Sequence, residues 1–481
     1  MTSGDFKVGH LTGTHVTGYC SWCYKKTKHI LVQQNFIRRN VYQCIACKNN
    51  TVICRYCSQL AKGTPSQETL KKMKLDGFGE FFQSWDNELC AEHDGTIASF
   101  SKLNMKIKDI TNFRKIFVRD KYNLAKAGKY AGLGISGVVS VAGVAATAGV
   151  GAAPFAAAMG KLGVLGATST GTAISSLSGA ALTSASLAAV GGSMAAGTAI
   201  ISASGLALGG VMGGVIANKY YGEDKSFAIR KLKDNNSNTR TIFINGFTQE
   251  NEVNFQDWQK GQLSFDDSHI MYGVNWASKT NLKLGMAFAK GVSKPVAEKL
   301  LIEIAKTGSK TAAKKINPIG WLMLISDLAG NPWHNSMIRA AQTGVQVAEA
   351  IARTEGQKFN LVGHSLGCRV IYYILEALST KDRQYINDVI LLGGAVGRKD
   401  RKGWKNAFKA VDGHLYNCHS DKDEVLRKLY QVANAGLSSP IGLKKIDLNH
   451  SKLTNINCDG LVDSHMTWKN HYEEILKKIY N

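Results

Sequence analysis

Three kinds of feature are missing or scarce in this sequence of 481 residues. The opening stretch, MTSGDFKVGH, contains no apolar run of the kind that forms the core of a secretory signal peptide. The ten cysteines are not spaced like a disulfide framework, because six form three C-x-x-C pairs and a seventh lies in a C-x-x-H. Acidic residues are outnumbered, with 36 Asp and Glu against 59 Lys and Arg and a formal net charge of +23. These features argue against a secreted, disulfide-bonded protein. We expect an intracellular chain whose surface favours anionic partners, either phospholipid head groups or nucleic acid.

Charge is almost absent from residues 130–218, where Lys161 is the only charged side chain. Small and apolar residues dominate this zone, and its uncharged runs are long enough for two to four membrane crossings, since one crossing needs about 20 apolar residues. The small residues would let transmembrane-like helical hairpins approach closely. Ser, Thr and Gly dilute the hydrophobicity, so conditional insertion and a soluble linker stay open as alternatives. Basic residues at both ends predict that both flanks are cytoplasmic and that the number of crossings is even.

The composition divides the chain into four parts, and its length allows two or three domains. We predict a Cys-rich metal-binding module in residues 1–100 and a basic linker or helix in 101–129. The Gly/Ala-rich zone follows in 130–218, and a globular domain occupies 219–481.

Closely spaced pairs of cysteines predict a metal module near the N-terminus. Two ligands separated by two residues can face one ion across a tight turn, and four such pairs supply two tetrahedral sites. Thiolates with one imidazole favour zinc, and closed four-ligand sites indicate a structural role. The pairs could combine sequentially or as a cross-brace, and the spacing allows either. The eight predicted ligands are Cys20, Cys23, Cys44, Cys47, Cys54, Cys57, Cys90 and His93.

The C-terminal part alternates between short apolar segments and helical patterns, which is typical of a doubly wound, mostly parallel α/β sheet. Helical patterns flank the segment KFNLVGHS on both sides. The predicted strands are TRTIFING, HIMYGVNW, KFNLVGHS, INDVILLGG, GHLYNCHS and GLKKIDLN.

A Gly-His-Ser-Leu-Gly sequence joins one of these strands to the next helix and predicts a nucleophilic serine, Ser365. A sharp strand-to-helix turn would expose the hydroxyl, and glycines at 363 and 367 would remove side chains that clash there. The backbone N–H groups of Leu366 and of Phe247, after TRTIFING, are the expected donors to an oxyanion. A turn serine without chemistry is the simpler alternative.

The other groups of a serine hydrolase are expected later in the chain, in the order acid and then histidine. Asp421 and Asp423 both follow the predicted strand GHLYNCHS and are candidate acids. His450, His465 and His471 are candidate bases.

At these motifs the chain resembles the α/β-hydrolase family once labelled domain of unknown function 726, whose eukaryotic members are described as transmembrane and coiled-coil domain proteins. The resemblance covers roughly residues 125–480 and implies that Asp423 is the acid and His465 the base. The chain departs from the family pattern at Ser464, where the family commonly has glycine before the histidine. The zinc-like N-terminal part is not a feature of that family. The stretches that carry the resemblance are VNWASKTNLKLGMAFAK, NPWHNSMIRAAQTGVQVAEAIA, FNLVGHSLGCRVIYYILEAL and LYNCHSDKDEVLRKLY.

Together these patterns predict a membrane-associated serine esterase, lipase or phospholipase that cleaves acyl esters through Ser365, His465 and Asp423. The apolar zone and the basic surface favour lipids, above all anionic lipids, as partners and substrates. The alternative is a membrane-inserting or permeabilising protein whose hydrolase-like domain is a regulator or scaffold. Nucleic-acid binding by the N-terminal part is the weakest of the three hypotheses.

Overall fold

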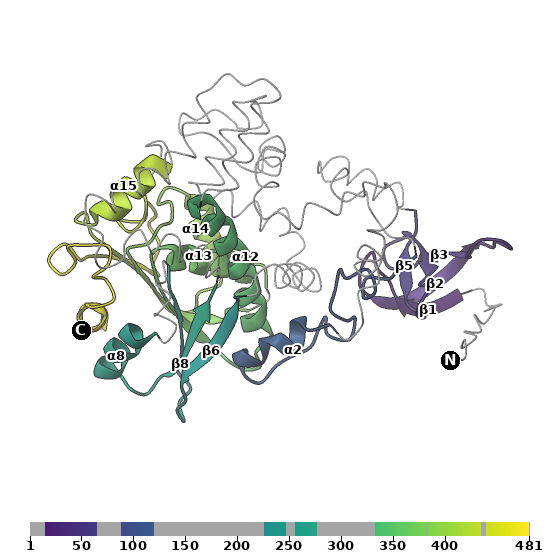
Figure 1. Cartoon of the computed structure of the whole chain (residues 1–481), viewed down its shortest axis with the longest axis horizontal. Coiled ribbons are helices and arrows are strands. Elements are labelled where there is room, and N and C mark those ends of the chain that lie inside the picture. The colour runs from purple at the N-terminus through teal and green to yellow at the C-terminus, as the bar shows by residue number, and fades with distance from the viewer. Residues whose placement is uncertain are drawn as a thin grey trace, which may run out of the picture. The chain divides into compact units, whose positions relative to one another are not determined.

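A computed structural model of the chain describes residues 15–64, 88–119, 226–246, 255–276, 332–381, 383–433 and 439–480 (Figure 1). The chain divides into two compact units. The first comprises residues 1–102 with 118–141, and the second comprises 103–117 with 142–481. The predicted apolar zone 130–218 and Phe247 lie outside the described residues.

The first unit is built on a five-stranded antiparallel sheet in which each strand pairs with the next along the chain. The apolar core of this sheet is small, with Val16, Tyr42 and Leu60 at its centre. A core of this size stabilises a small module poorly, so a cross-link such as a bound metal ion is expected to complete it. The strands are β1 (His15–Tyr19), β2 (Lys26–Gln33), β3 (Val41–Cys44), β4 (Asn50–Ile53) and β5 (Leu60–Lys62).

The second unit contains a seven-stranded sheet in the order β12-β11-β10-β9-β7-β8-β6. All neighbouring strands are parallel except the edge strand β6, which is antiparallel to β8. The prediction of an α/β protein is confirmed at this level. The strands are β6 (Ala228–Lys233), β7 (Arg240–Ile244), β8 (Ile270–Asn275), β9 (Phe359–His364), β10 (Ile386–Leu392), β11 (Leu415–His419) and β12 (Leu453–Asn457).

Helices cover both faces of this sheet, as the alternating burial of β7 illustrates. Ile242 and Ile244 join a core formed with α12, α13, α14 and α15, whereas Phe243 joins the opposite core with α8 and α16. Crossovers between parallel strands are right-handed. When the strand order reverses direction along the sheet, the connecting helices therefore lie on the opposite face. The helices are α8 (Gln256–Phe265), α12 (Pro332–Arg353), α13 (Leu366–Leu378), α14 (Arg401–Phe408), α15 (Glu424–Ala433) and α16 (Tyr472–Tyr480).

The winding direction reverses between β7 and β9. The chain proceeds from β7 to β8 in one direction and then crosses to β9, after which β10, β11 and β12 follow in the other direction. Ligands of open α/β sheets bind outside the carboxyl ends of the strands at such a reversal. The loop after β7 and the turn after β9 therefore mark the expected site.

Residues 103–117 lie within the stretch for which the sequence indicates a linker or helix, yet they form part of the second unit. They contain η1 (Ile110–Phe113) and α2 (Arg114–Phe117), and the apolar side chains of both join the core of the α/β unit. Ile107 forms a backbone bridge with Thr354 at the end of α12. This short segment thus completes a core whose other members come from much later in the chain.

One predicted strand is wrong. GLKKIDLN, residues 442–449, forms turns, and the last strand of the sheet is instead β12. The start of this segment is tied to the loop after β10, through Gly442 N to Gly394 O at 2.9 Å and, one residue earlier, Ile441 N to Val396 O at 2.8 Å. These bonds use N–H groups that a strand would direct to a neighbouring strand of the sheet. The edge strand β6 was not predicted from the sequence.

Candidate functional site

Ser365 occupies the sharp turn between β9 and α13 and adopts a backbone conformation that is rare for a residue with a side chain. Its φ is 57° and its ψ is −120°. Such conformations cost on the order of 1–3 kcal/mol and persist only where the surroundings hold them. Here the Ser365 N–H bonds to Leu392 O at 3.1 Å, and Ser365 O accepts from Ala395 N at 3.0 Å. The neighbouring strand β10 and the loop after it therefore fix the turn.

The hydroxyl of Ser365 is not used to cap the helix that it precedes. A serine at this position ordinarily accepts a hydrogen bond from a backbone N–H of the first turn, but Ser365 makes no such side-chain bond. Its Oγ instead lies 2.8 Å from Nε2 of His465. This geometry argues against an ordinary capping serine.

Two glycines allow the backbone to pack tightly around Ser365. A Cβ at Gly367 would lie 2.0 Å from Ile244 O, at the end of β7. A Cβ at Gly246 would lie 2.7 Å from the Cβ of Ser365 and 2.9 Å from Leu366 N. The absence of both side chains brings the loop after β7 directly against the serine turn, as expected for the reversal point of the sheet.

His465 reaches the serine from the loop between β12 and α16, 100 residues further along the chain. Its other ring nitrogen, Nδ1, lies 2.7 Å from Oδ2 of Asp423. The side chains of all three residues are fully buried, so the expectation that the turn exposes the Ser365 hydroxyl to solvent is wrong. The structure therefore brings Ser365, predicted from the strand-to-helix turn, together with Asp423 and His465, implied by the family resemblance, in a continuous hydrogen-bonded chain.

Asp423 lies in the turn before α15, and neighbouring donors fix its carboxylate. The backbone N–H of Leu426 donates to Oδ1 at 2.9 Å, and the indole N–H of Trp468 donates to Oδ2 at 3.0 Å. Oδ2 thus receives bonds from both the indole and the imidazole. Charge-assisted bonds of this kind satisfy a buried carboxylate and hold its orientation.

The alternative acid and bases lie elsewhere. Asp421 is exposed, and its backbone N–H bonds to Asp459. His450 stacks on Phe408 at a centroid distance of 4.0 Å, and its Nδ1 accepts from Lys452 N. His471 lies just before α16 and its backbone N–H bonds to Thr467 O. Among the described histidines, His465 is the one whose ring bridges Ser365 and Asp423.

Two side chains at the site were not identified from the sequence, Trp468 and His364. The Nε2 of His364 lies 3.0 Å from the backbone oxygen of His465, so this nitrogen must carry the proton and donate it. Burial and the neighbouring His465 and Lys469 lower the pKa of His364 well below its usual value, which keeps the ring neutral. The one feature of the sequence that could have indicated His364 as part of the site is its position directly before Ser365.

The predicted oxyanion donors are described only in part. Leu366 opens α13, in the first helical turn, where backbone N–H groups have no acceptor within the helix. The preceding residues of the β7 loop are held by two indoles: Trp258 donates to the side chain of Asn245 at 2.6 Å, and Trp276 donates to its backbone oxygen at 2.9 Å. The loop that leads to Phe247 is therefore held at Asn245, two residues before it.

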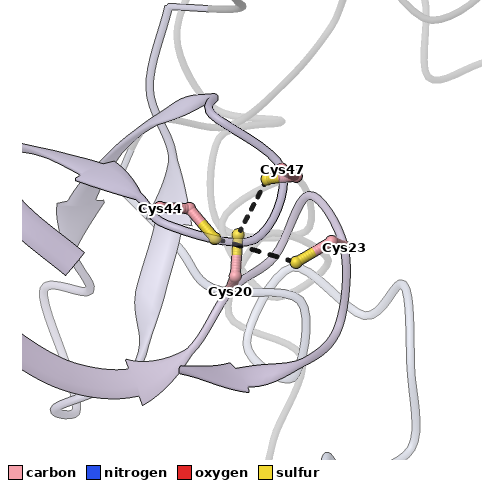
Figure 2. Close-up of side chains that lie close together, drawn as sticks. All are labelled: Cys20, Cys23, Cys44 and Cys47. Atoms are coloured by element: carbon pink, nitrogen blue, oxygen red, sulfur yellow. Dashed lines mark hydrogen bonds between the residues drawn. The ribbon is translucent and has the colours of Figure 1, made fainter. Parts of the chain in front are cut away.

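In the first unit, two clusters gather the eight predicted metal ligands in the sequential arrangement. Cys20, Cys23, Cys44 and Cys47 form one group, and the ligand atoms lie within 4.8 Å of one another. Their sulfur atoms point toward a common centre (Figure 2). Cys20 and Cys47 are 3.8 Å apart, as are Cys23 and Cys44. Thiolates at 2.3 Å from a tetrahedral zinc ion would lie about 3.8 Å apart, so the group fits that ion.

The backbone explains how each pair in this cluster is presented. Tyr24 and Lys48, which directly follow the second cysteine of each pair, have φ values of 59° and 60°. Their N–H groups bond back to Cys20 O at 2.7 Å and Cys44 O at 2.9 Å. Each C-x-x-C pair thus sits on a tight turn at the end of a strand, with both sulfurs on one side.

The second cluster consists of Cys54, Cys57, Cys90 and His93. Nδ1 of His93 lies 3.6 Å from the sulfurs of Cys54 and Cys57 and 3.3 Å from that of Cys90. With zinc–sulfur and zinc–nitrogen bonds of ordinary length, tetrahedral ligands would be about 3.5 Å apart. This group fits the same metal, with Nδ1 as the ligand atom.

Because the thiols lie so close together, their pKa values differ from one another. Hydrogen bonds from Cys20 and Cys23 lower the pKa of Cys47 to about 2, whereas hydrogen bonding to Cys23 and Cys47 raises the pKa of Cys20. Four sulfurs this close repel one another when ionised together, and a divalent cation relieves that repulsion. The donor set therefore favours a bound cation.

Within the part of the chain that the structure describes, we find no helix with both the length and the apolar character needed to cross a bilayer.

Comparison with known proteins places the chain in a family. The model of the family described as "Protein of unknown function (DUF726)" matches residues 125–481, and the chain belongs to this family. This match confirms the part of the resemblance that concerns membership of the family.

Relatives of the chain carry two kinds of name. A protein of Caenorhabditis elegans named as an uncharacterized membrane protein is 28% identical over 270 residues, 54% of this chain and 43% of its own length. A Saccharomyces cerevisiae protein named probable lipase MIL1 is 28% identical over 273 residues, 54% of this chain and 24% of its own length. An uncharacterized membrane protein of Schizosaccharomyces pombe is 33% identical over 168 residues, 34% of this chain and 21% of its own length. The chain therefore spans less than half the length of these relatives.

Proposed function

We propose that this protein is a serine hydrolase that cleaves acyl esters. One observation carries the proposal: Ser365 Oγ lies 2.8 Å from His465 Nε2, and His465 Nδ1 lies 2.7 Å from Asp423. A serine hydroxyl becomes a useful nucleophile when a base within hydrogen-bond reach accepts its proton and a third group orients that base.

In this mechanism His465 takes the Ser365 proton as the oxygen attacks the acyl carbon, and it then returns the proton to the leaving alcohol. Asp423 holds the imidazole in the required tautomer and stabilises its cationic form, while Trp468 and the Leu426 N–H hold Asp423. Leu366 and Phe247 N–H groups are the proposed donors to the oxyanion. A water molecule activated by His465 then releases the acyl group.

The architecture supports the same proposal. An α/β-hydrolase carries its nucleophile on a strained strand-to-helix turn at the top of the sheet, followed in the chain by the acid and then the histidine. Ser365 has that conformation and position, and Asp423 and His465 follow in that order. We therefore assign the second unit to the α/β-hydrolase fold as part of this proposal.

For the substrate we propose membrane lipids, including phospholipids. The name of the yeast relative, probable lipase, supports an ester of this class. The relatives named as membrane proteins, the uncharged zone 130–218 and the net charge of +23 support association with an anionic membrane.

We further propose that the two clusters of the first unit each hold one structural zinc ion. Cys20, Cys23, Cys44 and Cys47 would hold one ion, and the Cys54 group with His93 the other. Bound zinc would join strands and turns that share only a small apolar core.

Labelling with a fluorophosphonate probe tests the hydrolase proposal. The full-length protein is compared with Ser365→Ala, His465→Ala and Asp423→Asn, with and without liposomes. We expect labelling to vanish without Ser365 and to fall by at least about a hundredfold in the other two, because an unactivated serine reacts slowly. Stimulation by liposomes would support a lipid substrate.

Ser379→Ala is the matched control, because Ser379 lies at the opposite end of the same helix and its hydroxyl bonds to Glu376 O. Labelling that persists in Ser365→Ala, or none in folded wild-type protein, would contradict the proposal.

The naming of two relatives as membrane proteins favours a second function, in which the chain inserts into and permeabilises a bilayer while the α/β unit acts as a scaffold. A liposome leakage assay separates the two. Leakage that is unchanged in Ser365→Ala would support this second function, and leakage that disappears with the serine would exclude it.

A further inference from the structure

An unusual surface of the first unit is formed by one face of β2. Side chains alternate along this strand, so that Lys26, Lys28, Ile30 and Val32 are all exposed on one side while His29 is buried on the other. The order along the exposed face runs from two cations to two β-branched apolar residues. The exposed face of β2 therefore becomes more apolar toward the C-terminal end of the strand, which leads into the β2–β3 loop.

The loop that joins β2 to β3 continues this pattern. Phe36 is 96% exposed and Ile37 is 100% exposed, although both are large apolar side chains. In Figure 1 this hairpin projects beyond the other strands of its sheet. An exposed pair of this kind indicates a contact surface, because isolated soluble modules rarely present adjacent large apolar residues at a projecting tip.

Hydrogen bonds hold the tip in place. The side chain of Asn40 accepts from Asn35 N at 2.9 Å, and the side chain of Asn35 donates to Arg39 O at 3.0 Å. Arg39 in turn donates to Ile53 O, on the neighbouring strand β4. The loop is therefore presented in a defined conformation, which reduces the entropy that its ordering would cost on binding.

The charge around the hairpin is mostly positive, although Glu88 pairs with Arg39 at 3.9 Å and with Arg55 at 3.2 Å. Residues 15–64 contain no Asp or Glu. Exposed cations lie both behind the apolar tip, at Lys26 and Lys28, and beside it, at Arg38. The basic residues of this range are Lys25, Lys26, Lys28, Arg38, Arg39, Lys48, Arg55 and Lys62.

We propose that the β2–β3 hairpin is a docking site for an anionic lipid bilayer. Phe36 and Ile37 insert among the acyl chains at the interface, and Arg38, Lys26 and Lys28 contact lipid phosphates. The geometry favours a bilayer over other anionic partners, since a convex apolar tip needs a soft surface that it can enter. Nucleic acid would use the cations and could stack on Phe36, but it offers no apolar environment for Ile37.

This site is independent of the proposed hydrolase chemistry, because its residues belong to the first unit and Ser365 belongs to the second. The two proposals can therefore fail separately.

The test must distinguish the hairpin from the uncharged zone 130–218, for which the sequence already predicts membrane binding. An environment-sensitive fluorescent amino acid is incorporated at position 36 of the full-length protein, which is then reconstituted with vesicles. The vesicles contain phosphatidylcholine alone or phosphatidylcholine with phosphatidylserine, and bromine-labelled lipids serve as quenchers. We expect a blue shift and quenching in the anionic vesicles only.

Two variants and one control position sharpen the result. Ile37→Ser and the triple variant Lys26→Ala, Lys28→Ala, Arg38→Ala should reduce quenching, with the ratio of docked to free hairpins falling about fivefold for each cation removed. The same fluorophore at Leu263, an exposed apolar residue of α8, should not be quenched. Retention of two zinc ions per chain shows that the first unit of each variant is folded.

Three outcomes would overturn the proposal: fluorescence at position 36 that stays aqueous in anionic vesicles, quenching that is equal in neutral vesicles, or a signal that responds only to an added RNA oligonucleotide. None of these outcomes depends on whether Ser365 reacts with a fluorophosphonate.

Discussion

Trp468 links the proposed acid to the segment that carries the proposed base. It lies three residues after His465, and its indole N–H donates to the same carboxylate oxygen that contacts the imidazole. The indole also fits against Gly393, where a Cβ would lie 2.5 Å from Nε1. In the proposed mechanism Trp468 is thus a positioning residue that acts through Asp423.

We expect Trp468→Phe to slow fluorophosphonate labelling of Ser365 by roughly tenfold, because loss of one hydrogen bond to a charged group costs about 1.5–3 kcal/mol and only part of that falls on the reaction. The ring is retained, so packing changes little. An unchanged labelling rate would show that Asp423 does not need the indole.

His364 predicts a specific dependence of stability on pH. Burial lowers its pKa in the folded protein well below the usual 6.5, so its neutral form stabilises the fold. This contribution is complete above pH 6.5 and is lost as the pH falls toward the folded pKa, because the unfolded chain then binds the extra proton. In that interval the wild type should lose up to about 1.4 kcal/mol per pH unit through this group.

His364→Gln removes the titrating group and keeps a side-chain N–H that can donate to His465 O. We expect its free energy of unfolding to fall less steeply than that of the wild type below pH 6.5, as measured by chemical unfolding at a series of pH values. Parallel curves would mean that His364 is not buried in its neutral form.

At the residue scale, candidate site residues could be predicted from the sequence where the mechanism requires the groups in a fixed order along the chain. The strand-to-helix turn identified Ser365, and the order of acid and base limited the candidates to two aspartates and three histidines. The family resemblance, rather than periodicity or spacing, selected Asp423 and His465. Trp468 could not be found in this way, because its contact with Asp423 joins positions 45 residues apart.

The junction of β9 with α13 is the element on which the site depends, and Gly367 is its most sensitive position. In an ordinary helix Gly→Ala stabilises by about 1 kcal/mol. Here the new Cβ would meet Ile244 O at 2.0 Å, which requires β7 and α13 to separate. We expect Gly367→Ala to lower the free energy of unfolding by about 1–3 kcal/mol, as measured by chemical unfolding of the full-length protein.

Gly460→Ala is the matched control, because a Cβ at Gly460 meets nothing within 4 Å. Its effect should stay within about 0.5 kcal/mol. Equal effects of the two substitutions would contradict the close approach of α13 to β7.

Elements with strong local patterns were predicted, and those that depend on distant partners were not. The apolar run of β9 between two helical patterns identified that strand. GLKKIDLN has similar residues, but Gly442 packs against Gly393 and Gly394, a contact that no local pattern reveals. Likewise, the apolar residues of η1 and α2 have partners such as Phe227 that lie more than a hundred positions away.

At the scale of the whole molecule the two units have different sources of stability. Among the described residues, the second has two extensive apolar cores, whereas the sheet of the first has a small one beside the eight candidate metal ligands. Loss of bound metal is therefore expected to unfold the first unit and to leave the second folded.

Metal analysis tests this expectation. We expect about two zinc ions per purified chain, and about one in either Cys23→Ser or Cys57→Ser, since each substitution breaks one cluster. Cys458→Ser, a buried thiol of the second unit, is the control and should keep both ions. Chelation should abolish cooperative unfolding of the first unit without reducing the labelling of Ser365. Full zinc content in the Cys23 and Cys57 variants would refute the ligand assignment.

The packing of residues 103–117 predicts how the protein behaves after a protease has cut its chain. Phe113 packs edge-on against Phe227 with ring centroids 5.1 Å apart, and Lys231 pairs with Asp109 at 3.0 Å. A protease cut between residues 120 and 225 would leave these contacts intact. We expect the two fragments to co-purify under native conditions and to separate only in denaturant, because residues 103–117 stay packed within the second unit while they remain covalently joined to the first.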